Sequence, residues 1–186
     1  IAAGLNEEVI EPETEFLDLP KKIKCAGRSI GEYDNKIPSD LTAEQILIRS
    51  GNIGSVRIGQ KVGIEKLKHF LENIGVLNKI EFDIEEVGQP IPFRWGKCKL
   101  VTVSFGHGIT TTPLQLAKGY SIITNGGFEV NPTLIQKENK IKKNIILKSK
   151  LSEKINPILR KIVSTEEGTA GFADVKGYQI GGKTGT

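Results

Sequence analysis

The 186 residues include 26 Lys and Arg against 22 Asp and Glu, a formal net charge of +4, and 38% of them are hydrophobic. This composition argues against a disordered chain and is sufficient for one folded domain with a sizeable core. No apolar run approaches the roughly 18–20 residues of a membrane-spanning helix, and no basic region precedes an apolar stretch as in a signal peptide. The chain begins Ile1-Ala2-Ala3-Gly4 and contains no methionine. We interpret this start as a cut end, with any signal peptide or anchor removed or lying upstream.

Local patterns predict one strand and three helices in the first 75 residues. The segment up to Asp40 contains three prolines and is expected to be irregular, with a strand near residues 23–25. Thr42 and Gln45 form a capping box that starts a short helix, and this helix should end near residues 50–52. Apolar periodicity predicts two further helices, over residues 53–61 and 65–74.

The strongest local signal in the rest of the chain is Thr112-Pro113-Leu114-Gln115. It combines an N-cap, a proline at the first helical position and a glutamine that closes a capping box, and the helix should end at residues 125–127. We then expect an edge strand over residues 128–135, a helix over 152–163 interrupted near Pro157, and a strand over 175–180. Helices in the middle and strands at the end predict an α+β fold in a single domain.

The charge is distributed unevenly along the chain. The stretch from Lys137 to Lys161 has nine basic and two acidic residues, whereas the stretch from Glu7 to Asp18 has six acids and no base. A basic stretch can bind nucleic acid or an anionic surface, but no interleaved aromatic residues and no zinc or helix-turn-helix motif accompany this one. We therefore predict a solvated, Lys-rich loop and helix face, and no nucleic-acid partner.

The chain has two cysteines, Cys25 and Cys98, and two histidines, His69 and His107. They are too few for a disulfide-dense scaffold, and they are not spaced as the ligands of a metal cluster. We interpret the cysteines as unpaired structural thiols, although the sequence does not settle whether they pair. His107 and Trp95 are expected to be structural, and no metal or cofactor is expected.

Two short patterns could carry chemistry. Ser50-Gly51-Asn52 places a hydroxyl and an amide two residues apart at a helix junction, where a helix cap or turn is the simpler explanation. Lys183-Thr184-Gly185-Thr186 supplies a cation and two hydroxyls that can bind a carboxylate, and Gly185 lets an extended ligand approach the backbone. Alone, this pattern too could be an ordinary turn.

Together the two patterns resemble the Ser-Asp-Asn and Lys-Thr-Gly motifs, which form a signature with Ser-x-x-Lys in class A β-lactamases and penicillin-binding proteins. Their separation of 133 residues resembles penicillin-binding proteins better than class A β-lactamases. The blocks between them resemble class B penicillin-binding proteins, closest to the septal cell-division type, penicillin-binding protein 3. These blocks are Ser104-Phe105-Gly106-His107-Gly108, Thr112-Pro113-Leu114-Gln115-Leu116-Ala117 and Asn125-Gly126-Gly127. The resemblance extends from about Ala2 to Thr186.

The resemblance implies a partial transpeptidase fold, with a helical subdomain and the start of an antiparallel sheet. No Ser or Thr in the chain has a Lys three positions later. The nucleophilic serine and its lysine are therefore expected upstream of Ile1, and further strands and a closing helix downstream of Thr186. As an isolated piece the chain is expected to be inactive.

The resemblance also implies a peptidoglycan D,D-transpeptidase that forms a serine acyl-enzyme and is acylated by penicillins. Carried onto this chain, Ser50 would relay a proton, Asn52 would hold the amide of the acyl side chain, and Lys183 would supply positive potential. Thr184 and Thr186 would bind the terminal carboxylate, and Gly185 would let the substrate approach the backbone. The Thr186 N–H would form half of the oxyanion hole.

The partners implied by the resemblance are peptidoglycan stem peptides, β-lactam antibiotics and other cell-division proteins. The implied location is the inner membrane, with this domain in the periplasm and contact with the membrane only through an N-terminal anchor outside the chain. The alternatives are a β-lactamase or penicillin-sensing receptor of the same fold, a non-enzymatic basic binding module, and an α+β scaffold in which both patterns are turns.

Overall fold

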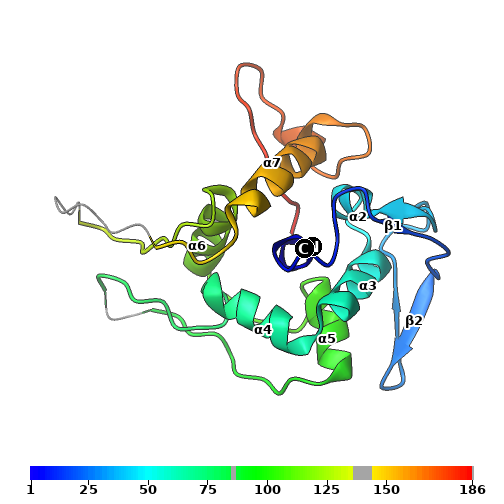
Figure 1. Ribbon diagram of the computed structural model, residues 1–186, viewed down its shortest axis with the longest axis horizontal. Helices are drawn as coiled ribbons and strands as arrows, with labels where there is room; N and C mark the ends of the chain where they lie inside the picture. Colours follow the sequence, from blue (N-terminus) through cyan, green and yellow to red (C-terminus); the bar gives the residue numbers. More distant parts are fainter. Residues whose placement is uncertain (85–86, 136–143, 186) are drawn as a thin grey trace.

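The computed structural model describes residues 1–84, 87–135 and 144–185. Helices dominate this part of the chain, and two small antiparallel sheets accompany them. In Figure 1 the short helix α1 lies in the centre of the view, close to the C-terminal end of the chain. The α-helices are α1 (Ala2–Asn6), α2 (Ala43–Ile48), α3 (Asn52–Val62), α4 (Ile64–Asn73), α5 (Lys97–Ser104), α6 (Pro113–Thr124) and α7 (Ser149–Ser164), and a short 3₁₀ helix, η1, spans Gly171–Ala173. The predicted mixture of helices with antiparallel strands is confirmed.

The strands lie in the first quarter of the chain. β2 (Lys22–Cys25) confirms the strand predicted near residues 23–25, and it forms a hairpin with β3 (Arg28–Gly31). Ala26 and Gly27 connect them, both with positive φ, as the tight turns favoured in two-residue hairpins require. The second sheet pairs β1 (Glu15–Phe16) with β4 (Leu41–Thr42). At the right edge of Figure 1, the β2–β3 hairpin extends beside α3.

Both predicted capping boxes form. The Thr42 hydroxyl accepts a hydrogen bond from the Gln45 amide at 3.2 Å, and the Gln45 side chain accepts one from the Thr42 amide at 3.0 Å. Thr112 and Gln115 make the same pair of contacts at the start of α6. The helices predicted over 53–61 and 65–74 correspond to α3 and α4 with shifts of about one residue at their ends.

The helix predicted over residues 152–163 is present as α7, but its predicted interruption and two predicted strands are wrong. α7 runs through Pro157 without interruption, because its buried apolar face, which includes Ile155, Ile158 and Ile162, outweighs the one missing amide donor. Residues 128–135 form no strand and make one isolated bridge, between Phe128 and Ile145. The strand expected over 175–180 is also absent. The Tyr178 amide donates to the Val175 carbonyl within the segment, and the Ile180 carbonyl accepts from Arg160 of α7, so no described strand pairs with it.

The core is built around α3, which contacts α1, α2, α4 and α5. It packs tightly against α5 at Gly59, where an added Cβ would lie 1.8 Å from the Ser104 Oγ. α7 closes the other side of the core against α1, α2 and α6. The largest fully buried apolar side chains are Ile46, Ile53, Ile58, Ile122, Leu151, Ile158 and Ile162.

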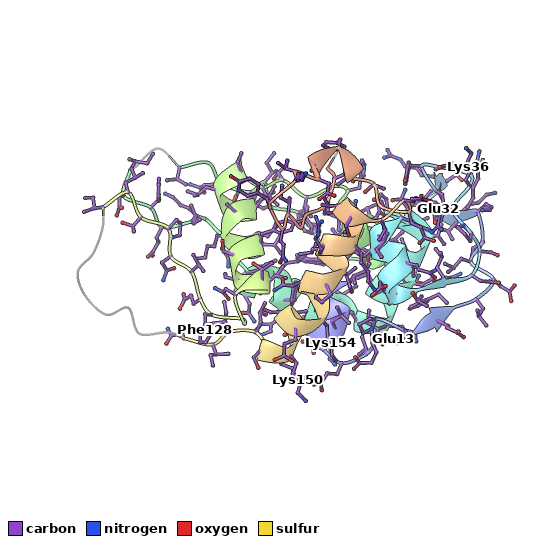
Figure 2. The ribbon with its side chains drawn as sticks, turned by 90° about the horizontal axis from the view of Figure 1, so that it is seen from above. Glu13, Glu32, Lys36, Phe128, Lys150 and Lys154 are labelled. Carbon is purple, nitrogen blue, oxygen red and sulfur yellow. A yellow bond between two sulfur atoms is a disulfide. The ribbon has the colours of Figure 1, made fainter. Side chains whose placement is uncertain are left out.

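The acidic stretch from Glu7 to Asp18 contacts the described part of the basic stretch from Lys137 to Lys161. Lys148 pairs with Glu8 at 2.9 Å, and Lys154 pairs with Glu11 at 2.6 Å. Figure 2 places Lys154 of α7 and Glu13 of the acidic segment in the same region. The described part of the basic stretch is therefore not only solvated, as predicted, but also contacts the acidic segment. Lys137, Lys140, Lys142 and Lys143 lie outside the described residues.

Candidate active site

The turn between α2 and α3 fixes Ser50 and Asn52. The Ser50 amide donates to the Leu47 carbonyl at 3.2 Å and the Gly51 amide donates to the Ile46 carbonyl at 2.8 Å, the hydrogen-bond pattern of a Schellman motif. Ser50 occupies the left-handed position of this motif, with φ of 58°, where glycine is usual. A serine in a conformation that glycine adopts more easily is compatible with a role for its hydroxyl.

Glu32 holds the first turn of α3. The N-cap residue of this helix is Gly51, which has no side chain to accept from the free amides at the helix start. The Glu32 carboxylate accepts from the Asn52 amide at 2.6 Å and from the Ile53 amide at 3.0 Å. The Asn52 side-chain amide in turn donates to the Gly31 carbonyl at 2.9 Å. The end of β3 therefore sets the position of the Asn52 side chain.

The Lys183 segment is attached to α7. The Arg160 guanidinium donates to the Ile180 carbonyl at 2.9 Å, and the Gly182 amide donates to the Leu159 carbonyl at 3.1 Å. Beyond this attachment, the Lys183 ammonium donates to the Thr184 hydroxyl at 2.9 Å. Partial burial removes solvent from the Lys183 ammonium and lowers its pKa.

One cavity of about 150 Å³ brings the two motifs together. Ser50 and Asn52 line it from the α2–α3 turn, and Lys183 lines it from a segment 133 residues further along the chain. Ser104 and Phe105, at the end of α5, complete the polar and aromatic lining that faces them. A hydroxyl, an amide and a cation around one small cavity can together bind an extended peptide that ends in a carboxylate.

The other three predicted site residues are Thr184, Gly185 and Thr186, and none of them is among the described lining of this cavity. The Thr184 hydroxyl is 2.9 Å from the Thr169 hydroxyl, beside the cavity and not in its lining. A Cβ added at Gly185 would meet no atom within 4 Å, so the backbone there is accessible to a ligand. Thr186 lies outside the described residues.

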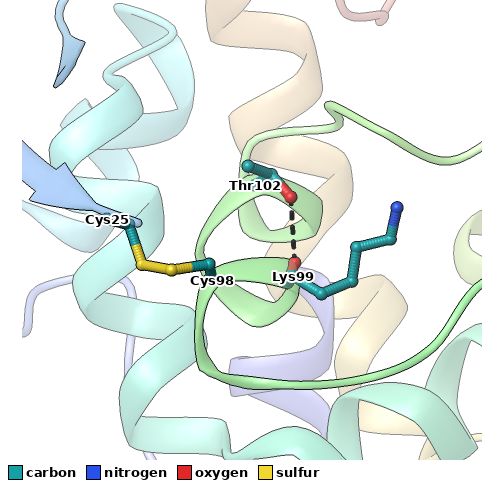
Figure 3. Close-up of a disulfide and its surroundings, with 4 residues drawn as sticks. All are labelled: Cys25, Cys98, Lys99 and Thr102. Carbon is teal, nitrogen blue, oxygen red and sulfur yellow. Dashed lines mark hydrogen bonds between the residues drawn. A yellow bond between two sulfur atoms is a disulfide. The ribbon is translucent and has the colours of Figure 1, made fainter. Parts of the chain in front are cut away.

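A larger pocket of about 680 Å³ shares Asn52 and Phe105 with this cavity. Its walls are the β2–β3 hairpin and α5, and Figure 3 shows the disulfide between Cys25 and Cys98 that joins these walls. The interpretation of the cysteines as unpaired thiols is therefore wrong. The hairpin brings the Cys25 Cα within 5.6 Å of the Cys98 Cα in the first turn of α5, despite a separation of 73 residues in sequence.

The sequence reasoning missed two features of this site. The first is Glu32, which lies 20 residues before Asn52. The sequence indicated only that some acceptor was needed, since the glycine N-cap of α3 leaves helix amides without a partner. The second is α5, which was not predicted because its Val101-Thr102-Val103 run favours a strand. The helical wall of the large pocket was therefore not predicted either. Among the described residues, no group of three or more His, Cys, Asp or Glu is placed to hold a metal ion.

The whole chain, residues 1–186, matches the family model for the penicillin binding protein transpeptidase domain. It is 30% identical over 191 residues to the probable peptidoglycan D,D-transpeptidase FtsI of Caulobacter vibrioides, and the match covers 100% of this chain and 32% of that protein. A peptidoglycan glycosyltransferase structure from Burkholderia ambifaria has a TM-score of 0.90 at 21% identity, covering 99% of this chain and 59% of that one. The apo TP domain of penicillin-binding protein 3 from Burkholderia pseudomallei has a TM-score of 0.88 at 20% identity, covering 98% and 56%.

The chain therefore belongs to the penicillin-binding protein transpeptidase family. The resemblance to the penicillin-binding protein 3 type and the partial transpeptidase fold predicted from the motifs are both confirmed. The chain spans about a third of the length of the Caulobacter relative. No helix within the described residues has the length and apolar character needed to cross a bilayer.

Proposed function

We propose that the protein containing this chain is a peptidoglycan D,D-transpeptidase that cross-links stem peptides and is acylated by penicillins. The observation that carries the proposal is the single cavity lined by Ser50, Asn52 and Lys183. In the proposed reaction a serine hydroxyl attacks the carbonyl between two terminal D-alanines and the terminal D-alanine leaves. The amine of a second stem peptide then displaces the serine, which forms the cross-link. The serine and its lysine base would come from the part of the protein that precedes Ile1.

The residues of this chain bind the peptide and transfer the proton of the attacking serine. Lys183 and Thr184 bind the carboxylate of the terminal D-alanine, and the half-buried Lys183 attracts it more strongly than a fully solvated cation would. Ser50 relays the proton from the attacking serine to the departing D-alanine amine. Asn52 holds the backbone amide on the acyl side of the scissile bond.

Gly185 and Thr186 complete the proposed site. Gly185 lets the peptide lie along the chain, and the Thr186 hydroxyl and N–H serve the terminal carboxylate and the oxyanion. The domain that performs this reaction is longer than residues 1–186, because the nucleophile and the remaining sheet are supplied by the whole protein.

We also propose a role in septal cell division, with an inner-membrane anchor outside this chain, this domain in the periplasm, and other division proteins as partners. The Cys25–Cys98 disulfide supports the location, because disulfides persist in the periplasm and are rare in the cytosol. Three ion pairs weigh against the alternative of a basic binding module, since they occupy described cations of the stretch that it would use. They join Lys148 to Glu8, Lys154 to Glu11 and Lys161 to Glu44.

Fluorescent-penicillin labelling of the whole protein tests the proposal. Wild-type protein should become labelled, and Asn52→Ala and Lys183→Ala should each reduce the labelling rate at least about tenfold, as the loss of a binding group at the reacting centre does. The 186-residue chain alone should stay unlabelled. Labelling of the short chain would place the nucleophile within it, and failure of the folded whole protein to label would contradict the proposal. Rapid, repeated turnover of nitrocefin would instead favour the β-lactamase alternative.

A further inference from the structure

The large pocket beside Asn52 has a strongly biased charge. Three of its lining residues are basic: Arg28 of β3, Lys99 of α5, and His107 of the segment that follows α5. None of the described residues that line it is an Asp or a Glu. Glu32, which follows the lining residue Gly31, has both carboxylate oxygens occupied by the amides of α3. The lining therefore includes two cationic side chains and an imidazole, and none of its described residues is acidic.

The pocket is also held open by its surroundings. The Cys25–Cys98 disulfide joins its two walls, and Figure 3 shows Lys99 and Thr102 on the same helix as Cys98. The Lys99 ammonium lies 4.1 Å from the centroid of the Phe93 ring and donates to the Gly108 carbonyl. His107 stacks on Phe105 with ring centroids 6.0 Å apart. In contrast, Arg28 is exposed and forms no ion pair with another described residue, so its guanidinium is available to a ligand.

The pocket is continuous in position with the site already described. Asn52 and Phe105 line both the large pocket and the small cavity of Ser50 and Lys183. A peptide that ran from Lys183 past Asn52 would bring its next residue to the large pocket, because Asn52 lines both cavities. The volume of about 680 Å³ is sufficient for one long side chain and its neighbouring backbone.

We propose that this pocket is a subsite for an anionic group, a carboxylate carried by the stem-peptide residue that precedes the terminal D-alanine pair. Arg28 binds the carboxylate, because a guanidinium matches the two oxygens in a bidentate manner. Lys99 adds positive potential, and the His107 imidazole offers a polar ring nitrogen beside it. This inference rests on the proposed function, since it assumes that the peptide runs from Lys183 past Asn52. It adds a preference between substrates that the family motifs do not specify.

Two penicillins that differ by one carboxylate test the subsite in the whole protein. Carbenicillin is benzylpenicillin with a carboxylate on the side-chain carbon next to the amide that Asn52 would hold. Arg28→Glu should lower the second-order acylation rate of carbenicillin, relative to that of benzylpenicillin, by roughly fivefold or more, and added salt should shrink this difference. Lys24→Glu is the matched control, because Lys24 is an exposed cation of the same hairpin that does not line the pocket. The subsite would be overturned if the ratio of the carbenicillin to the benzylpenicillin acylation rate were the same in three proteins. These are the wild type, Arg28→Glu and an Arg28→Glu/His107→Gln double variant.

A second measurement separates failure of the subsite from failure of the proposed function. If benzylpenicillin does not acylate the folded wild-type protein, the proposed function fails, and binding without acylation still tests the pocket. Acetyl-L-Glu-D-Ala-D-Ala and acetyl-L-Gln-D-Ala-D-Ala differ only in a carboxylate against an amide. The subsite is supported if the Glu peptide binds more tightly than the Gln peptide, and if Arg28→Glu removes this difference while Lys24→Glu keeps it. Equal binding of the two peptides to the wild-type protein overturns it.

Discussion

The carboxylate of Glu32 and the amide of Asn52 are joined by a hydrogen bond of 2.6 Å, and this contact links the β2–β3 hairpin to the proposed catalytic turn. The same carboxylate accepts from Ile53, and the preceding carbonyl, that of Gly31, accepts from the Asn52 side chain. A carboxylate at a helix N-terminus is stabilised both by these amides and by the helix dipole. Glu32 is thus a positioning residue for Asn52, acting from outside the cavity that Asn52 lines.

Replacing Glu32 should affect both stability and acylation. In the whole protein, Glu32→Ala should cost about 1–3 kcal/mol of unfolding free energy, because two amides at a partly buried helix start lose a charged acceptor. It should also slow penicillin acylation, because Asn52 is no longer held. Glu32→Gln retains an acceptor oxygen and should recover part of both losses.

Glu13→Gln is the matched control for these variants. Glu13 is exposed, and no ion pair or side-chain hydrogen bond joins it to another described residue. Unfolding in urea and the acylation rate should be unchanged in this variant. An acylation rate of Glu32→Ala equal to that of Glu13→Gln would mean that Asn52 needs no support from the hairpin.

The disulfide should contribute a measurable part of the stability. The Cys25–Cys98 bond closes a loop of more than 70 residues, for which about 2–4 kcal/mol of stabilisation is typical. Cys25→Ser/Cys98→Ser should lower the melting temperature of the whole protein under non-reducing conditions. Reductant should lower the wild-type melting temperature to a similar value and leave that of the double variant unchanged. Two alkylatable thiols in the denatured, non-reduced protein would show that the bond does not form.

The helices that could be predicted from the sequence are those whose signals are local. Thr42 with Gln45, and Thr112 with Gln115, fix their helix starts through contacts between residues three apart. The meeting of Ser50 with Lys183 was expected only from the family resemblance, since nothing local relates residues 133 positions apart. The same resemblance gave no information on the charge of the pocket beside them.

The features that were not predicted depend on contacts between distant segments. Whether Cys25 pairs with Cys98 depends on how a hairpin packs against a helix, and sequence spacing carries no record of that packing. The expected break at Pro157 was wrong because a local penalty was weighed without the burial that opposes it. The strand expected over residues 175–180 was wrong because a strand needs a hydrogen-bonded neighbour, and this segment bonds to α7.

The crossing of α3 and α5 should not tolerate an added methyl group. At Gly59 a Cβ would lie 1.8 Å from the Ser104 Oγ and 2.7 Å from its Cβ, so the two helices must move apart. Gly59→Ala should therefore cost about 1–3 kcal/mol, as overpacking of a core does. Ser104→Ala in the same chain should recover only part of the loss, because the Cβ contact remains. Gly96→Ala is the control, since a Cβ there meets no atom within 4 Å, and equal urea midpoints for Gly59→Ala and Gly96→Ala would contradict the close crossing.

The pH dependence of acylation should reflect the burial of Lys183. Loss of solvent lowers the pKa of its ammonium from 10.5, so Lys183 becomes neutral at a lower pH than an ordinary lysine. A neutral amine no longer attracts the penicillin carboxylate, and the acylation rate should therefore fall as pH rises through this lowered pKa. Stability should change in the opposite direction, because the unfolded chain binds the proton more tightly than the folded one over the same range, and unfolding free energy then rises with pH. Solvent contact of the half-exposed side chain keeps the stability change small.

Lys183→Arg separates this explanation from general alkaline inactivation. Arginine remains charged throughout the range, so a variant that retains activity should lose the alkaline decrease that Lys183 causes, even if its maximal rate is lower. The measurement is the second-order acylation rate of benzylpenicillin between neutral pH and the alkaline limit of the folded protein. A decrease at the same pH in wild type and Lys183→Arg would assign it to another group, and the proposed role of the Lys183 charge would then lose its support.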